Sequence, residues 1–293
     1  KIAIAKIEEN LSYNIYSIKN GRLYTDRIQD TAVIIDKKII EGPSFQLREK
    51  NVNSNVDSNI VFKKGTPRIL RNLNGTVLSL LTGGGGNNNY WHWLFDVLPR
   101  LKICETVKKL ETIDYFLFPD IKEKFQQETL KSLSFPIEKL LSSEKYRHIK
   151  TNELIITNHP YMFTEDPHKD AQKIPIWIIK WLRQKFLVNL KASNKNYPKK
   201  IYIDRSDSKS NVSQHRTLLN EKEIRHYLKE KNFTFVRLSD LNFSDQVLFF
   251  NNADCIIGLH GSGFANLTFC KPNTKVIEFR NSTSGPVIEN IAK

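Results

Sequence analysis

The sequence has few cysteines and no long apolar segment. Its 293 residues include only Cys104, Cys255 and Cys270, which are too few and too widely spaced for a disulfide framework or a zinc site. No apolar run approaches the about 20 residues that a membrane-spanning helix needs. A hydrophobic content of 40% excludes intrinsic disorder, and the length suggests about two domains. Because residue 1 is lysine, we expect the native protein to begin earlier.

Acidic residues are also scarce. The chain has 31 Asp and Glu against 45 Lys and Arg, which gives a formal net charge of +14. The basic residues are spread in pairs such as Lys37-Lys38 and Lys199-Lys200, and this diffuse pattern favours a solvated surface. Nucleic-acid binding is an alternative from another functional class. Since the sequence has neither a basic helix nor an RNA-binding aromatic signature, we expect no nucleic-acid partner.

An Asp-x-Asp pair is missing as well. An enzyme that holds a diphosphate through Mg²⁺ or Mn²⁺ would be expected to offer such a cluster of carboxylate oxygens. The sequence therefore predicts no bound metal. If a diphosphate binds, we expect cationic side chains and helix N-termini to hold it.

The pattern of the chain changes near Gly75. Residues 1–74 predict a β-rich N-terminal extension packed on the first domain, whereas the residues that follow alternate between strands and helices, which is typical of βαβ units around a parallel sheet. We expect a first Rossmann-like domain over 75–192, a polar linker, and a second over 199–293 that is truncated at its C-terminal end. The expected strands are Tyr13–Ile18, Thr31–Ile35, Asn59–Phe62, Thr76–Leu81, Asp114–Phe118, Glu153–Thr157, Ile201–Asp204, Phe233–Leu238, Cys255–Gly258 and Val276–Phe279. The expected helices are Tyr90–Lys109, Ile121–Leu133, Gln172–Leu190, Leu218–Lys231, Ser244–Asn252 with Ser244 as its cap, and the short Gly263–Cys270.

The segment Asn89–Leu101 (NYWHWLFDVLPRL) places a histidine and an aspartate on one helical face. His92 and Asp96 are four residues apart, and their helix follows the glycine run Gly83–Gly86 at the end of a strand. Such strand ends bind ligands in open α/β sheets, and consecutive glycines let the backbone approach one. The aspartate can act as a base or fix the tautomer of an imidazole that does. The alternatives are a structural His–Asp pair and a flexible surface loop.

Two segments of the second domain carry further polar groups at expected strand ends. Arg205 follows the strand Ile201–Asp204, and Lys209 and Arg216 lie in the loop after it, where cations suit a phosphate. His260-Gly261-Ser262-Gly263 links a strand to a helix, a geometry that offers backbone N–H groups to a phosphate. Glu278 lies on the next strand, where a carboxylate can accept hydrogen bonds from ribose hydroxyls. A solvent-exposed basic loop and a salt bridge of Glu278 are the alternatives.

Three segments together resemble glycosyltransferase family 61. They are residues 75–101, the stretch from Arg205 through 224, and residues 253–279, in this order and spacing. The most specific parts are Tyr-Trp-His-Trp-x-x-Asp, which ends at Asp96, and His-Gly-Ser-Gly-x-x-Asn, which ends at Asn266 and precedes a Val-Ile-Glu strand.

This resemblance implies an α/β fold of the GT-B type, with two facing Rossmann-like domains. It also implies an inverting, metal-independent glycosyltransferase that moves a hexosyl, N-acetylhexosaminyl or pentosyl group from a nucleotide diphosphate donor, expected to be a UDP-sugar. The acceptor would be a glycan or lipid-linked glycan in capsule or lipopolysaccharide biosynthesis. We expect a cytoplasmic enzyme with peripheral contact to the inner membrane, or a lumenal ER or Golgi enzyme if the source is eukaryotic. A donor activated by CMP or CDP is the alternative.

The resemblance also assigns residues to roles. Asp96 would be the catalytic base with His92 orienting it, although the reverse assignment stays open. No metal ligands are implied. The donor-binding residues of the second domain would be Arg205, Lys209, Arg216, His260, Gly261, Ser262, Gly263, Asn266 and Glu278. The acceptor-side residues of the first domain would be Gly85, Gly86, Asn89, Tyr90 and Trp93.

Overall fold

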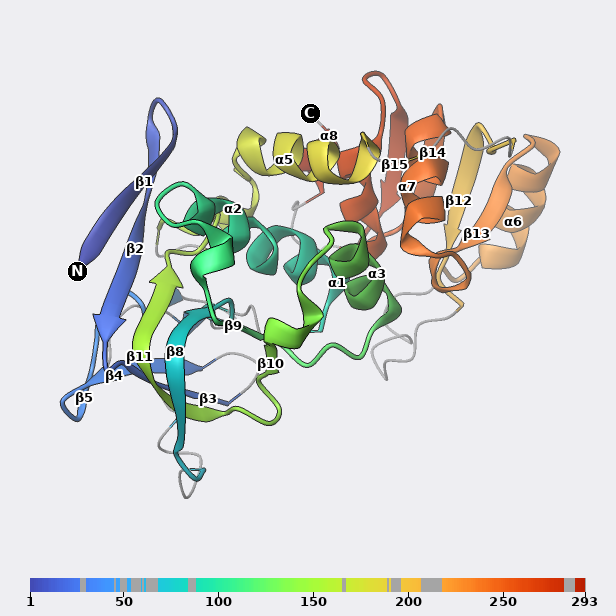
Figure 1. The fold of residues 1–293 in the computed structure, drawn as a ribbon. Helices are drawn as coiled ribbons and strands as arrows, with labels where there is room; N and C mark the ends of the chain where they lie inside the picture. Colours follow the sequence, from blue (N-terminus) through green and yellow to red (C-terminus); the bar gives the residue numbers. More distant parts are fainter. Residues whose placement is uncertain are drawn as a thin grey trace. The chain divides into compact units, whose positions relative to one another are not determined.

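The fold of the chain, in a computed structural model, is drawn in Figure 1. The structure describes residues 1–26, 30–44, 46–47, 52–53, 59, 61, 68–83, 88–164, 167–188, 190, 196–206, 218–281 and 288–292. They form two compact units, Lys1–Ile178 and Ile179–Lys293, and the boundary lies inside helix α5 (Ile176–Leu187). The predicted domain boundaries at 74, 192 and 199 stay predictions.

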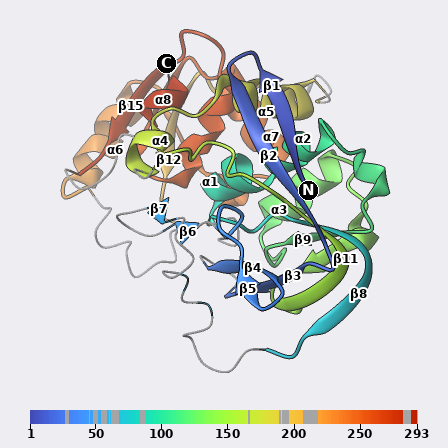
Figure 2. The same cartoon turned by 90° about the vertical axis from the view of Figure 1, so that its left-hand side faces the viewer.

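The first unit is built on a mixed sheet, which has nine strands among the described residues. Its parallel part has the order β10-β9-β8-β11, and β11 then pairs antiparallel with β3 through His148–Lys150 and with β2 through Glu153–Thr157. β4 and β5 continue the sheet beyond β3, and β1 pairs with β2 (Figure 2). The strands are β1 (Ile2–Glu8), β2 (Leu11–Lys19), β3 (Arg22–Thr25), β4 (Thr31–Ile35), β5 (Lys38–Ile39), β8 (Arg71–Ser79), β9 (Tyr115–Phe118), β10 (Leu140–Ser142) and β11 (His148–Thr157), with a separate pair β6 (Gln46–Leu47) and β7 (Val52–Asn53).

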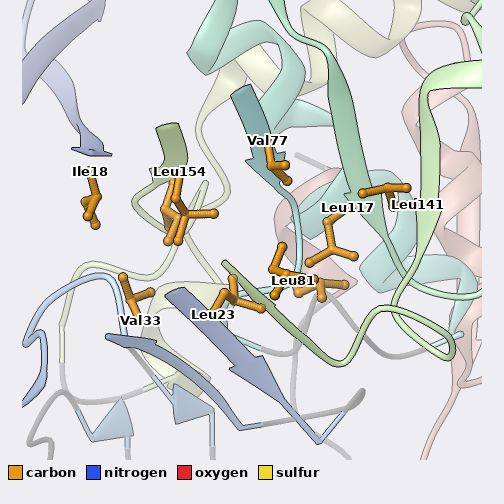
Figure 3. Close-up of a cluster of buried hydrophobic side chains, with 10 residues drawn as sticks. Ile18, Leu23, Val33, Val77, Leu81, Leu117, Leu141 and Leu154 are labelled. Atoms are coloured by element: carbon orange, nitrogen blue, oxygen red, sulfur yellow. The ribbon is translucent and has the colours of Figure 1, made fainter. Parts of the chain in front are cut away.

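A buried apolar cluster joins the N-terminal strands to the parallel strands (Figure 3). Burial of each such side chain stabilises the fold by about 1.5–3 kcal/mol. The N-terminal strands therefore share both the sheet and the core of the strands that follow them. The cluster consists of Ile18, Leu23, Val33, Val77, Leu81, Leu117, Leu141, Ile149, Leu154 and Ile156.

The predicted helix Tyr90–Lys109 is helical in three successive parts. α1 (Tyr90–His92) is capped by the Asn89 side chain, which accepts from the Trp91 N–H at 2.8 Å. A π-helical turn over Trp93–Val97 follows, and α2 (Pro99–Glu105) comes next. Because Pro99 has no N–H to donate to the preceding turn, the regular α-helical ladder is interrupted there, and the Leu98 N–H bonds to the Trp93 carbonyl at 3.1 Å. The remaining helices of the unit are α3 (Lys124–Ser132), α4 (Pro167–Ala171), the first residues of α5 and short 3₁₀ helices over Leu110–Thr112 and Ile137–Lys139.

The second unit has a fully parallel sheet with the order β13-β12-β14-β15. Since the strands run in one direction, their carboxyl ends lie at the same edge, as the predicted βαβ pattern requires. The strands are β12 (Lys200–Asp204), β13 (Thr234–Arg237), β14 (Cys255–Leu259) and β15 (Lys275–Phe279). The helices are α6 (Glu221–Glu230), α7 (Phe243–Asn252), α8 (Glu289–Ala292) and 3₁₀ helices over Leu238–Asp240 and Ser262–Phe269.

The mixed α/β class is confirmed, with local differences from the prediction. Ser244 was expected to cap α7, which is wrong: the helix starts one residue earlier, and the Asn242 side chain accepts from the Asp245 N–H at 2.8 Å. The expected strand Asn59–Phe62 falls partly outside the described residues. In the part of the chain that the structure describes, no helix is both long and apolar enough to cross a membrane.

Candidate active site

His92 and Asp96 form a close pair in the first unit. Nδ1 of His92 lies 2.6 Å from Oδ2 of Asp96, a distance typical of a charge-assisted hydrogen bond. The Asp96 side chain is completely buried, whereas His92 keeps 23% of its side-chain surface exposed. The predicted shared helical face is therefore confirmed, and the imidazole is the member of the pair that reaches solvent.

Arg100 anchors the helix that carries this pair. Its side chain is fully buried, and its Nε donates to the Asp96 backbone carbonyl at 2.7 Å. Its guanidinium also donates to the carbonyl of Thr82 beyond β8 and, at 3.3 Å, to the carbonyl of Thr157 at the end of β11. Burial lowers the pKa of Arg100 to about 10, which still leaves it charged at neutral pH. The guanidinium thus ties the helix to the carboxyl ends of two parallel strands.

His159 is a third member of the site that the sequence reasoning missed. It lies just after β11, its side chain is 1% exposed, and its Nε2 lies 3.5 Å from Oδ2 of Asp96. A signal was present: Asn-His-Pro directly follows the predicted strand Glu153–Thr157, which is where strand-end chemistry is expected in an α/β sheet. The ring of Tyr161 contacts His159 edge-on, with 4.7 Å between the ring centroids.

The surroundings separate the pKa values of these three groups. Burial raises the pKa of Asp96, but the His92 and His159 imidazoles outweigh burial and hold it well below its ordinary value of 3.8. Burial lowers the pKa of His92, but the Asp96 charge outweighs burial and the pKa lies above the ordinary 6.5. For His159 burial dominates, and its pKa lies below 6.5. At neutral pH, Asp96 is thus a carboxylate and His159 a neutral imidazole.

The predicted acceptor-side residues lie in different surroundings. Trp93 is completely buried and its indole N–H donates to the Thr129 hydroxyl at 2.8 Å, as in a core residue. Tyr90 is 8% exposed and packs edge-on against Phe125. The Asn89 side chain caps the helix. Gly85 and Gly86 lie outside the described residues.

In the second unit, the strand ends bring Arg205, His260 and Glu278 together. Arg205 follows β12 and its guanidinium donates to the His260 carbonyl. Nδ1 of His260, just after β14, hydrogen-bonds to the carboxylate of Glu278 on β15. Both side chains are partly buried, with 18% of His260 and 10% of Glu278 exposed. Three of the predicted donor-binding residues therefore form one cluster at the carboxyl edge of the sheet.

The glycine turn after β14 is shaped by close packing. A Cβ on Gly261 would lie 2.8 Å from Cζ of Arg205, and one on Gly263 would lie 2.7 Å from a methyl carbon of Leu238. Ser262 is partly buried at the start of the 3₁₀ helix. Asn266 is fully buried and its amide donates to the Gln246 side chain at 3.1 Å, so it braces the turn from within.

The exit of β12 is held by a salt bridge that was not predicted. Arg225 of α6 lies with both terminal nitrogens 3.1 Å from Oδ2 of Asp204, and its guanidinium stacks over the Phe235 ring at 4.5 Å. Asp204 also accepts the Ser206 N–H at 2.9 Å, which fixes the backbone on both sides of Arg205. Lys209 and Arg216 lie outside the described residues. Among the described residues, no group of three or more His, Cys, Asp or Glu side chains is arranged to hold a metal ion.

Each of the two clusters has side chains that suit one chemical task. The first offers an imidazole oriented by a buried carboxylate, the arrangement of a general base. The second offers a guanidinium, a histidine and a glycine turn at a strand edge, the arrangement that binds phosphate.

Comparison with known proteins gives a family match. No curated protein matches the chain. The family model for glycosyltransferase 61 matches residues 90–277, which is more than half of the chain and includes His92, Asp96 and the His260 turn. The chain therefore belongs to glycosyltransferase family 61 and is a glycosyltransferase.

Proposed function

We propose that this glycosyltransferase catalyses an inverting, metal-independent transfer of a sugar from a nucleotide diphosphate donor, a UDP-sugar, to a glycan hydroxyl. The observation that carries the proposal is the bond between the buried Asp96 and the partly exposed His92. An inverting transfer needs one base that removes the acceptor proton as the hydroxyl attacks. This pair is suited to that single task.

His92 is the base in this proposal, and Asp96 orients it. Asp96 has no exposed surface, and its lowered pKa makes it a poor proton acceptor. The bond from Nδ1–H of His92 to Asp96 leaves Nε2 as the nitrogen that accepts a proton. The geometry thus supports the reverse of the assignment expected from the resemblance.

The transfer makes one bond at the anomeric carbon and breaks another. The acceptor oxygen forms a bond to the anomeric carbon while its proton moves to Nε2 of His92. The bond between that carbon and the donor phosphate oxygen breaks, and its electron pair leaves with the nucleotide diphosphate. Donors fixed around the developing negative charge lower the barrier because they need no reorganisation.

The second unit binds the donor in this proposal. Arg205, Lys209 and Arg216 neutralise the diphosphate, and the backbone N–H groups of the turn from Gly261 to Gly263 contact it. Glu278 holds the His260 imidazole, so its bond to His260 competes with the ribose contact expected earlier. The cations would supply the charge that a metal ion supplies in other transferases, and the two units would correspond to the acceptor and donor domains of a GT-B enzyme.

A donor screen tests this function. Thermal unfolding of the full chain is followed with UDP, GDP, CDP and CMP, each with and without EDTA, because a ligand that binds only the native state raises its stability. We expect the largest shift with UDP, and the same shift with EDTA. A shift with CMP or CDP alone would support the alternative donor class, and a shift abolished by EDTA would refute metal independence.

The stereochemistry and the acceptor need a second experiment. Transfer from UDP-sugars to lipid-linked glycans and capsule or lipopolysaccharide fragments is assayed, and the anomeric configuration of the product is read by NMR. The opposite configuration to the donor supports inversion, whereas a retained configuration refutes it. Full activity of the His92→Ala variant would refute the role of His92 as base.

A further inference from the structure

The protonation of the buried His159 is dictated by its backbone contacts. Nδ1 of His159 lies 3.1 Å from the Met162 N–H and 3.3 Å from the Tyr161 N–H, and both donate to it. A nitrogen that accepts hydrogen bonds carries no proton, so a neutral imidazole must carry its proton on Nε2. That nitrogen is the one 3.5 Å from Oδ2 of Asp96.

We propose that His159 is a positioning residue, which presents its Nε2–H to the Asp96 oxygen that binds His92 and so fixes both the direction and the basicity of the catalytic imidazole. This inference rests on the proposed role of His92 as the base. Asp96 Oδ2 thereby faces a proton donor on two sides, His92 at 2.6 Å and His159 at 3.5 Å. The short bond to His92 holds the carboxylate, and the 3.5 Å separation from His159 is longer than a normal hydrogen bond, so the His159 N–H acts on Asp96 chiefly through its dipole.

The loop that carries His159 is itself anchored to the N-terminal strands. The Asn158 side chain accepts the Asn14 N–H at 2.5 Å, and the Pro160 carbonyl accepts the Tyr13 hydroxyl at 2.8 Å. Arg100 donates to the Asn158 carbonyl at 3.4 Å. Strand β2 therefore contributes to the site by fixing residues 158–160.

The groups around His159 keep it a neutral donor. The charged and titratable groups that face this site, among the described residues, are Asp96, His92, Arg100 and Tyr161. Burial together with Arg100 keeps the pKa of His159 below 6.5 despite the attraction of Asp96. The Tyr161 hydroxyl accepts from the Trp91 indole at 3.3 Å, and burial raises its pKa well above the ordinary value. His159 thus does not compete with His92 for the acceptor proton.

This arrangement predicts in which direction the pKa of His92 changes when the His159 N–H is removed. The positive end of the Nε2–H dipole points to Asp96 and reduces the negative potential that the carboxylate exerts on His92. Removing that dipole strengthens the pull of Asp96 on the Nδ1 proton. The pKa of His92 therefore rises, and a larger fraction of the base is protonated at neutral pH.

The first test reads the tautomer directly in the folded wild-type chain. Long-range ¹⁵N–¹H NMR of the histidine rings distinguishes a protonated Nε2 from a protonated Nδ1. We expect His159 to be the Nε2–H tautomer and not to titrate as the pH is lowered through 6.5, the ordinary histidine value. A His159 that is protonated on Nδ1, or that titrates near that value, would overturn the proposal.

The second test uses two variants. His159→Leu removes the donor, and we expect kcat to fall about tenfold or more and the acid limb of its pH profile to move to higher pH, with the acceptor KM unchanged. His159→Gln keeps an amide N–H in the place of Nε2, and we expect the acid limb to stay near the wild-type position. Equal profiles for wild type and His159→Leu would refute the proposal.

The two proposals fail in distinguishable ways. If His92→Ala keeps full activity, His92 is not the base, whatever the tautomer of His159. If His92→Ala is inactive but His159 has the wrong tautomer or His159→Leu leaves the acid limb unmoved, only the positioning role is lost. The NMR measurement needs no variant. It therefore tests the positioning role of His159 even if the His159→Leu chain folds poorly.

Discussion

Oδ2 of Asp96 lies 2.6 Å from Nδ1 of His92, and the carboxylate is completely buried while the imidazole keeps part of its surface exposed. This unequal exposure favours the imidazole as the group that meets the substrate and the carboxylate as the group that orients it. A buried, charged carboxylate is costly unless several groups compensate it. Here His92, His159 and Arg100 do so, which is why Asp96 can stay ionised beneath the imidazole.

The Asp96→Asn substitution tests the orienting role of the carboxylate. It removes the charge that stabilises protonated His92, and an amide does not enforce the Nδ1–H tautomer. We expect kcat to fall by about 10²- to 10⁴-fold, the usual range for general-base catalysis. Initial rates at saturating donor and acceptor measure this.

The matched control is Asp254→Asn. Asp254 has 71% of its side chain exposed and pairs with Lys199 at 3.8 Å. The Asp254→Asn variant should keep the wild-type kcat, because an exposed ion pair contributes little to the stability of the fold. An Asp96→Asn enzyme as fast as this control would contradict the orienting role.

The pH dependence of kcat follows from the raised pKa of His92. The base must be neutral to accept a proton, so activity is lost as the pH falls through the pKa of His92. Since Asp96 holds that pKa above 6.5, we expect the acid limb to have its midpoint above 6.5. In Asp96→Asn the residual activity should show its acid limb at lower pH, opposite in sign to the shift expected for His159→Leu. Two limbs that coincide would contradict this reasoning.

The Arg100→Met substitution tests the anchor of the helix. The guanidinium donates to the backbone carbonyls of Asp96, Thr82 and Thr157. Its positive charge also attracts the buried Asp96 carboxylate. Removing one partner of a buried charge pair typically costs about 3–5 kcal/mol, and we expect a loss of this size in the free energy of unfolding. Urea denaturation measures it.

Lys102→Met on the same helix is the control. Lys102 has 38% of its side chain exposed and pairs with Glu105 at the surface. Its loss should change the free energy of unfolding by no more than about 0.5 kcal/mol. Equal stability of the two variants would mean that Arg100 does not anchor the helix.

Local patterns predicted much of this architecture, because most strands and helices carry their own signal. β4 (Thr31–Ile35) coincides with its prediction, and the alternation after Gly75 predicted the parallel strands of both units except β10 (Leu140–Ser142), which was missed. The His92–Asp96 pair was predictable since helical periodicity fixes which residues four apart share a face. The π-helical turn was not, because it depends on how the helix accommodates Pro99 within the packed core.

Tertiary contacts decide the parts that the sequence left open. His159 is far from Asp96 in sequence, and the pairing of β11 with β8 together with the Arg100 bonds to Thr157 and Asn158 brings its loop to the helix. Which member of the His92–Asp96 pair is exposed also depends on packing, so spacing alone left both assignments open. The sharing of one sheet by the N-terminal strands and β11 is likewise a long-range pairing that no local pattern encodes.

The Gly261→Ala substitution tests the donor-binding cluster of the second unit. A Cβ at this position would lie 2.8 Å from Cζ of Arg205, and the flexible guanidinium would have to move away. If Arg205 contacts the diphosphate, we expect the donor KM to rise about tenfold, which corresponds to about 1.4 kcal/mol. Kinetics with varied donor and saturating acceptor measure this.

Gly258→Ala separates this effect from simple misfolding. A Cβ there would lie 3.0 Å from Cβ of Ile203 and 3.3 Å from Cζ of Phe264, atoms of the packed core that have little room to move. It should lower the free energy of unfolding by about 1–3 kcal/mol, whereas Gly261→Ala should leave it nearly unchanged. If Gly261 acts through Arg205, adding Gly261→Ala to Arg205→Ala should not raise the donor KM further, because residues in contact are not additive. Additive increases in KM would mean that the glycine turn affects donor binding independently of Arg205.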